Sequence, residues 1–151
     1  DLCQLVQETL RPYEHQRPAP RLEKPAETAV IRAAPAELRS AIGHIVQNAI
    51  DAAAETACAD HPPSVDIAII TGQRWHEVIV SDNGPGMDSD FIRERLFAPF
   101  ASTKGVSGMG IGAYQARTYV RALGGDITVT SQPGAGTRFC IRMPAVAAEV
   151  S

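Results

Sequence analysis

The chain has 151 residues, a length typical of one domain, and 44% of them are hydrophobic, which is enough for a sizeable core. The formal net charge is −3 and no run of Lys and Arg occurs, which argues against the basic surface of a nucleic-acid-binding protein. No apolar stretch approaches the length of a membrane span, and no signal-peptide pattern follows Asp1. Because Asp1 is an unusual natural first residue, we expect a segment trimmed from a longer protein. Cys3, Cys58 and Cys140 form no CxxC pair, which predicts free thiols in a reducing compartment rather than a zinc site.

The first third of the chain predicts two helices around a proline-rich connector. Residues 1–11 carry apolar residues at helical spacing and end at Pro12, and residues 12–27 predict a connector with one short extended piece. The stretch "TAVIRA" (28–33) predicts a strand. Pro35 opens a long helix that we expect to run to about Ala59.

The remaining two thirds predict two hairpins separated by helices. Residues 64–70 and 76–82 predict an antiparallel strand pair, followed by a short helix from about Ser89. A second long helix is expected over Ile111–Leu123, ended by the Gly124-Gly125 pair, and residues 126–143 predict a last hairpin. Helices that alternate with antiparallel pairs predict an α+β fold, a two-layer α/β sandwich.

Four glycines fall within "KGVSGMGIG", the stretch that opens the second long helix. It is not a P-loop, because Ile111-Gly112 stands where Lys-Ser/Thr is required, and it does not follow a strand as a dinucleotide fingerprint does. Backbone N–H groups at a helix N-terminus bind anions, and Lys104 and Ser107 add a charge and a hydroxyl. The stretch therefore fits a phosphate site, while tight turns alone would also explain the glycines.

Two further stretches carry polar residues in unusual places. In "VSDNGPGM", Asp82 stands at the end of a predicted strand. A carboxylate beside glycines at such a place either forms a turn or accepts a hydrogen bond from an amino group on a planar ring. In "HIVQNAIDAAAE", His44, Asn48, Asp51 and Glu55 form one polar stripe on a helix. This stripe is either a solvated face or a set of oxygen donors suited to Mg²⁺.

These stretches, in this order, resemble the ATP-binding catalytic domain of sensor histidine kinases, which belongs to a superfamily shared with type II topoisomerases, mismatch-repair ATPases and a heat-shock chaperone. The resemblance covers about residues 28–144, with "HIVQNAIDA" as the N box, "DNGPGM" as G1, "FAPFASTK" as the F box, "GMGIG" as G2 and "GAGTRF" as the last glycine box. The wording "FAPFASTKGVSGMGIGAYQAR" most resembles kinases associated with exopolysaccharide and exosortase systems. The resemblance implies a Bergerat ATP-binding fold over residues 28–146, with a mixed, mostly antiparallel sheet covered by helices on one face. Residues 1–27 would then be the end of a dimerisation helix and a linker, and residues 147–151 a C-terminal tail.

The resemblance also implies the site. Asp82 would accept from the adenine amino group, Asn48 would coordinate Mg²⁺, and Lys104 would hold the phosphates of ATP. Phe97 and Phe100 would anchor a lid over roughly residues 88–107, although plain core packing also explains them. The implied nucleotide-binding residues are Asn48, Asp51, Ala52, Asp82, Gly84, Gly86, Met87, Phe97, Phe100, Lys104, Gly108, Met109, Gly110, Ile111, Gly112 and Thr137. The implied catalytic residues are His44, Asn48 and Lys104.

One position departs from the pattern. The hydrolases of the superfamily place a Glu four residues before the metal-binding Asn, where it activates water, but this chain has His44. The absent carboxylate argues against a dedicated hydrolase. His44 would act as a base, contact a phosphate, or only hydrogen-bond along its helix.

The implied reaction is phosphoryl transfer from ATP to a histidine on a dimeric helical hairpin, for relay to an aspartate of a response regulator. None of His15, His61 and His76 has the context of such an acceptor, so the chain alone is expected to bind ATP, to remain monomeric and not to phosphorylate itself. The parent is expected to be a homodimer with this domain in the cytoplasm, and anchoring of the parent in the inner membrane stays open. The alternatives are a serine kinase of the anti-sigma type and a scaffold module that senses nucleotide without transferring phosphate.

Overall fold

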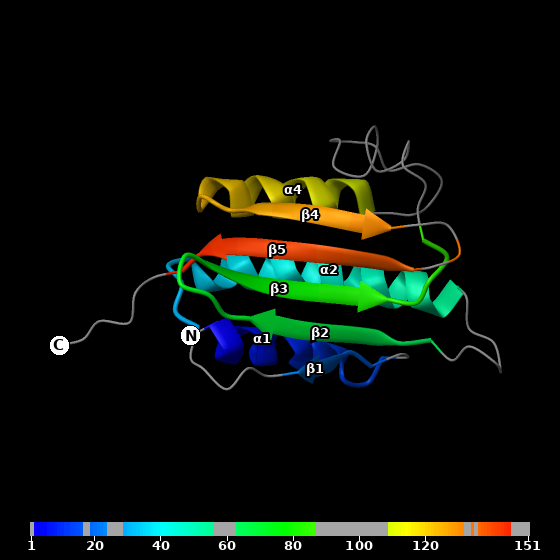
Figure 1. The fold of residues 1–151 in the computed structure, drawn as a ribbon. Coiled ribbons are helices and arrows are strands. Elements are labelled where there is room, and N and C mark those ends of the chain that lie inside the picture. The colour runs from blue at the N-terminus through cyan, green and yellow to red at the C-terminus, as the bar shows by residue number, and fades with distance from the viewer. Residues whose placement is uncertain are drawn as a thin grey trace.

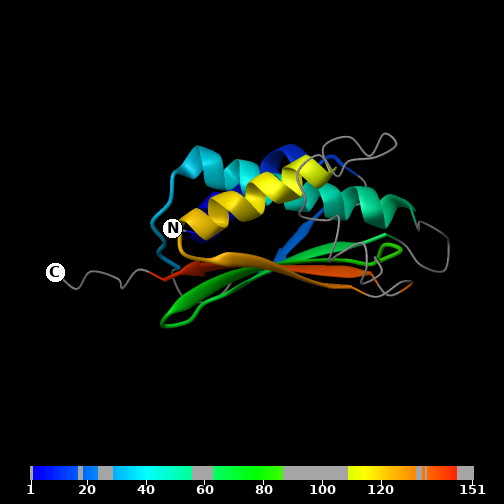
Figure 2. The same ribbon diagram turned by 90° about the horizontal axis from the view of Figure 1, so that it is seen from above.

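The structure of the protein, a computed structural model, describes residues 2–16, 19–23, 29–55, 63–86, 109–131, 134 and 136–145. Within these residues, a sheet of five strands is covered on one face by three helices, and its other face is open (Figure 2). The helices are α1 (Leu2–Leu10), α2 (Pro35–Glu55) and α4 (Met109–Ala122). This arrangement confirms the predicted α+β two-layer sandwich.

The sheet has the spatial order β1-β2-β3-β5-β4 (Figure 1). Only the pairing of β1 with β2 is parallel, and the other three pairings are antiparallel. The strands are β1 (Arg21–Glu23), β2 (Val65–Ile70), β3 (Trp75–Asp82), β5 (Thr137–Pro144) and β4 (Asp126–Ser131). Because the two hairpins lie side by side through β3 and β5, the start of β5 is next to the end of β3.

The core lies between the helices and the inner face of the sheet. Alternate residues of a strand share a face, so the strand register defines rows of side chains that cross the sheet. Two inner rows are entirely apolar: Ile67, Val80, Phe139 and Val129, then Ile69, Val78, Ile141 and Ile127. They belong to one core cluster with α2 residues Ile42, Ile45, Val46 and Ile50.

Several predicted elements are confirmed. The helix predicted over 1–11 is α1, the helix predicted over Ile111–Leu123 is α4, and both hairpins form at the predicted places. Gly124 and Gly125 end α4 by donating their N–H groups to the carbonyls of Arg121 and Val120. The long helix from Pro35 is confirmed to Glu55, while residues 56–62 and the helix predicted from Ser89 lie outside the described residues.

The strand predicted over 28–33 is wrong for its described part, residues 29–33, which form neither helix nor strand. Ala29 is buried, but its carbonyl accepts from the N–H of Leu2 at 2.7 Å instead of joining a ladder. An apolar run predicts that a segment is buried but not that it pairs with a strand. Ala29 is buried beside the start of α1 instead of within the sheet. The edge strand is instead β1, the short extended piece of the predicted connector.

The N-terminal segment belongs to the same packed unit as the rest of the chain. Leu2 and Val6 of α1 are fully buried in the core cluster. The Tyr13 hydroxyl, in the 3-10 turn η1 (Arg11–Tyr13), donates to the carbonyl of Gly43 in α2 at 3.3 Å. The stretch 1–27, predicted as a helix end and a linker, thus contributes the helix α1 and the strand β1 to this fold.

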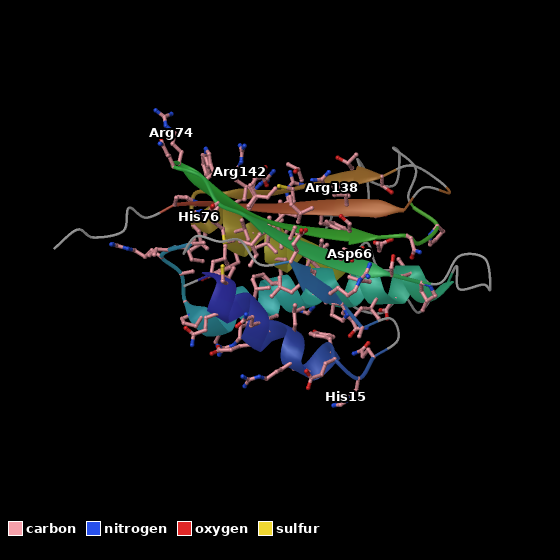
Figure 3. All side chains as sticks on the ribbon, turned by 60° about the horizontal axis from the view of Figure 1, so that its bottom comes forward. His15, Asp66, Arg74, His76, Arg138 and Arg142 are labelled. Atoms are coloured by element: carbon pink, nitrogen blue, oxygen red, sulfur yellow. The ribbon has the colours of Figure 1, made fainter. Side chains whose placement is uncertain are left out.

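The open face of the sheet carries charged side chains. Arg138 and Arg142 of β5 project from it away from the helices, and Arg74 projects from the turn before β3 (Figure 3). The Arg142 guanidinium lies 5.0 Å from the centre of the Trp75 ring. Cys140 on this face and Cys3 in α1 are free thiols, as predicted, and Cys58 lies outside the described residues. Across the part of the chain that the structure describes, no helix has the length and apolarity that a membrane span requires.

We predict that the Val6→Ala substitution lowers the free energy of unfolding by about 2 kcal/mol, because it leaves a cavity where α1 meets the core. Denaturant unfolding of the chain measures this change. Gln4→Ala on the exposed side of the same helix is the matched control and should change it by less than about 0.5 kcal/mol. Equal effects of the two substitutions would show that α1 is not part of the core.

Candidate functional site

Four elements converge at one end of the molecule. In Figure 1, β3 ends, β5 begins, α2 ends and α4 begins on the same side of the sheet. The helices run antiparallel, because the Tyr119 hydroxyl near the end of α4 bonds to the backbone of Ala34, which precedes α2. The N-terminal turn of α4 is therefore brought beside the C-terminal half of α2 and the end of β3.

Asp82, the last residue of β3, is the buried acid of this convergence, with 9% of its surface exposed. One carboxylate oxygen accepts from the N–H of Gly84 at 2.8 Å, and the N–H of Thr137 also donates to the carboxylate. Burial raises the pKa of Asp82 to about 6, while these two hydrogen bonds lower it. At neutral pH the site thus holds a buried carboxylate that accepts hydrogen bonds and has no cation as partner among the described residues.

Glycines allow the chain to close tightly around Asp82. A Cβ atom at Gly84 would lie 2.6 Å from the carbonyl oxygen of Ala52, so the turn after β3 touches the backbone of α2. A Cβ atom at Gly136 would collide with the carbonyl oxygen of Asp82. Gly136 also has a φ of +85°, which other residues rarely adopt. The two close approaches fix the position of Asp82 relative to α2 and β5.

A polar row lies at the site end of the inner face of the sheet. The strand register places Val65, Asp82, Thr137 and Ser131 side by side, next to the apolar row that contains Val80. Thr137 is 6% exposed. The hydroxyls of Ser131 and Thr137 are 2.8 Å apart, and the Ser131 hydroxyl also donates to the carbonyl of Gly136 at 3.0 Å. The end of the core is therefore lined by hydrogen-bonding groups.

Asn48 of α2 faces the same region, one helical turn before Ala52. Its side-chain amide nitrogen is buried and has no hydrogen-bond partner among the described residues. A buried polar atom without a partner is costly unless a ligand or water completes its bonding. The Asn48 amide nitrogen thus has unused capacity to donate hydrogen bonds next to the Asp82 turn.

Two members of the predicted polar stripe lie apart from Asp82. His44 is exposed and lines a groove of 160 Å³ between α2 and α4, together with Gln115 and Tyr119. Asp51 is exposed and accepts from Gln47 at 2.8 Å, on the side of α2 that faces the N-terminal segment. Burial and the charge of Asp51 raise the pKa of Tyr13 there.

The other predicted site residues divide into two groups. Gly110 and Gly112 lie in the first turn of α4, as expected for backbone donors at a helix N-terminus, and Gly86 follows Gly84 with a φ of 77°. The lid and five predicted ligands lie outside the described residues, namely Met87, Phe97, Phe100, Lys104 and Gly108. Met109 and Ile111 lie on the same turn of α4.

No sequence pattern indicated an individual role for Ser131 or Gly136. Gly136 was part of the quoted last glycine box, but its contact with Asp82 depends on the pairing of β3 with β5. Ser131 stands six residues before Thr137 across a glycine-containing turn, and this hairpin spacing is the signal that could have placed the two opposite each other.

The fold and the site together define a class of protein: an α/β sandwich whose sheet end, long helix and helix N-terminus surround a buried carboxylate. Comparison with protein families agrees, since the sequence model of the HATPase_c family, "Histidine kinase-, DNA gyrase B-, and HSP90-like ATPase", matches residues 33–147. The chain belongs to this family.

Curated relatives carry the names of sensor kinases. The chain is 33% identical over 103 residues to the "Probable C4-dicarboxylate sensor kinase" of Halalkalibacterium halodurans, 33% over 111 residues to "Sensor histidine kinase DcuS" of Escherichia coli K12, and 31% over 125 residues to "Two-component sensor PprA" of Pseudomonas aeruginosa. These matches cover 68%, 72% and 82% of the chain. They cover only 19%, 19% and 13% of those relatives, so the chain corresponds to one part of much longer proteins.

A solved structure confirms the fold. The "Mycobacterial sensor histidine kinase MprB" superimposes with a TM-score of 0.74 over 96% of both chains, at 19% sequence identity. The superposed region includes nearly all of the chain, in agreement with the packing of the N-terminal segment onto α2. The association with exopolysaccharide and exosortase systems stays a prediction.

The raised pKa of Asp82 predicts a pH dependence of stability. The folded protein holds this proton more tightly than the unfolded chain, so the contribution of Asp82 to stability is fully present below pH 4 and is lost as pH rises through about 6. Between pH 4.5 and 7, wild type should lose about 2 kcal/mol of unfolding free energy relative to Asp82→Asn. Denaturant unfolding of both proteins at several pH values measures this difference, and parallel curves would contradict the assignment.

Proposed function

We propose that this chain binds Mg·ATP at the convergence of β3, β5, α2 and α4, and that it supplies the γ-phosphoryl group to a histidine of a sensor kinase. The observation that carries the proposal is the buried Asp82 carboxylate, held by two backbone N–H groups beside the N-terminal turn of α4. Membership of the HATPase_c family and the sensor-kinase names of the relatives support it.

The base of the nucleotide is proposed to lie against the polar row. An ionised carboxylate only accepts hydrogen bonds, so Asp82 suits an exocyclic amino group such as that of adenine. The close contact of Gly84 with Ala52 leaves no side chain between the turn and α2. This contact holds the turn after Asp82 in place beside the proposed position of the base.

The phosphates are proposed to lie between Asn48 and the start of α4. The N–H groups of the first turn of a helix and its dipole favour an anion, and Gly110 and Gly112 stand in this turn. Asn48 suits Mg²⁺ through its side-chain oxygen, because this ion usually takes one or two oxygen ligands from the protein beside phosphate oxygens. The buried amide nitrogen of Asn48, which has no partner among the described residues, would donate to a phosphate oxygen. Bound Mg²⁺ would neutralise part of the phosphate charge. Lys104 and Gly108 are proposed as further phosphate ligands.

The proposed reaction requires the protein mainly to position groups and to balance charge. The bond between the γ-phosphorus and the β–γ bridging oxygen breaks, a bond forms to an unprotonated imidazole nitrogen of the acceptor, and ADP leaves. His44, exposed in the groove between α2 and α4, is proposed to contact the phosphate or the acceptor as it approaches. The acceptor is proposed to lie on a dimerisation hairpin outside this chain.

The setting of the domain is also a proposal. The parent is proposed to be a homodimeric sensor kinase, with this domain in the cytoplasm and a response regulator as its phosphoryl acceptor partner. Residues 28–146 would form the catalytic unit, and residues 1–27, whose helix α1 packs on α2, would connect it to the hairpin.

Calorimetric titration with ADP and Mg²⁺ tests the proposed base site. We expect wild type to bind and Asp82→Ala to bind roughly a hundredfold more weakly, because the amino group loses its charged acceptor in a buried site. Asp66→Ala, which removes an exposed carboxylate from the open face, is the matched control and should bind like wild type. Equal binding by Asp82→Ala and wild type would refute the site.

A further inference from the structure

The polar row contains one arrangement that the proposed function does not use. Ser131 pairs with Thr137 in the β4–β5 register, and Thr137 pairs with Asp82 in the β3–β5 register. The three side chains therefore stand in one line across the sheet, from the edge strand to the carboxylate. Ser131 is too far along this line to be a neighbour of Asp82, so any effect on the site passes through Thr137 or Gly136.

The hydrogen bonds of Ser131 fix the direction of the Thr137 hydroxyl. Each hydroxyl has a single proton to donate. Ser131 gives its proton to the carbonyl of Gly136 at 3.0 Å, and this carbonyl can only accept. The 2.8 Å contact between the two hydroxyls then needs Thr137 as the donor and Ser131 as the acceptor. Toward any other partner, the Thr137 oxygen presents lone pairs.

Gly136 makes this arrangement difficult to change. Its backbone is buried, so its carbonyl needs a donor. The contact between Gly136 and the Asp82 backbone prevents the turn from moving away from β3. The packing that positions Asp82 therefore also fixes the Gly136 carbonyl, to which the Ser131 hydroxyl donates its proton.

We infer that Ser131 is a positioning residue for base selection: it holds the Thr137 hydroxyl as an acceptor, so that Thr137 and Asp82 together form a site that only accepts hydrogen bonds. This inference rests on the proposed nucleotide site. Such a site favours a base with an amino group at its recognised edge, as in adenine, over one with a carbonyl oxygen there, as in hypoxanthine. Since Thr137 and Asp82 are both more than nine-tenths buried, water compensates little for a mismatch.

The inference predicts the consequence of removing the Ser131 hydroxyl. In Ser131→Ala, the Thr137 proton has lost its acceptor and the hydroxyl is able to rotate and donate to a carbonyl oxygen. Preference for ADP over IDP should therefore fall by about tenfold, mainly through tighter binding of IDP, while ADP affinity changes little. Ser131→Thr keeps a hydroxyl at this position and should restore the preference.

The experiment is calorimetric titration of the chain with Mg·ADP and Mg·IDP, for wild type and for each variant. Thr130→Val is the control, because Thr130 is the exposed neighbour of Ser131 on the opposite face of β4. Thr137→Val, which removes the second hydroxyl with almost no change of shape, is the additional variant. It should weaken ADP binding and leave IDP binding unchanged, and it keeps the test decisive if Ser131→Ala does not fold.

The outcomes separate this inference from the proposed function. A loss of preference in Ser131→Ala, absent in Thr130→Val and restored in Ser131→Thr, supports the inference. An unchanged preference, or equal weakening of ADP and IDP, overturns it while the nucleotide site stands, because Ser131 would then have only a structural role. Failure of folded wild type to bind ADP overturns the proposed function and, with it, this inference.

Discussion

The site depends on one constraint: a carboxylate must be held inside the domain at the end of an apolar sheet face. Burial penalises the charge of Asp82 and raises its pKa to about 6, and backbone N–H groups of Gly84 and Thr137 offset part of this penalty. Both donors require the chain to pass very close to its neighbours. The glycines at 84 and 136 and the pairing of β3 with β5 follow from that requirement.

The same packing explains how a small domain combines a rigid core with a ligand site. The inner face of the sheet is apolar in the rows that contain Val80 and Val78, and these rows pack against the long helix α2. The polar row that contains Asp82 and Thr137 lies at the end of the sheet where α2 ends and α4 begins. A nucleotide bound there would contact groups of β3, β5 and α2 that the core has already positioned.

Much of this could be predicted from the sequence, because the strongest signals were local. The periodicity of residues 35–55 and the two hairpins predicted the layers, and glycines beside Asp82 marked a turn at the end of a strand. The strand predicted over 28–33 was wrong because an apolar run does not reveal whether a partner strand exists. Ser131 had no recognisable role, because its neighbours are defined only by the register of β4 on β5. Asp51 accepts a hydrogen bond from Gln47, and its place among the nucleotide-binding residues stays a prediction.

The central claim is that adenine nucleotide binds where Asp82, Thr137 and the first turn of α4 meet. The most direct measurement is a two-dimensional amide NMR titration of the chain with Mg·ADP. We expect the largest shift changes at the N–H groups of Gly84 and Thr137, which donate to the Asp82 carboxylate, and in the first turn of α4. Residues of the open face such as Arg142 should stay unchanged. Changes confined to the open face, with the Gly84 and Thr137 signals unmoved, would contradict the account.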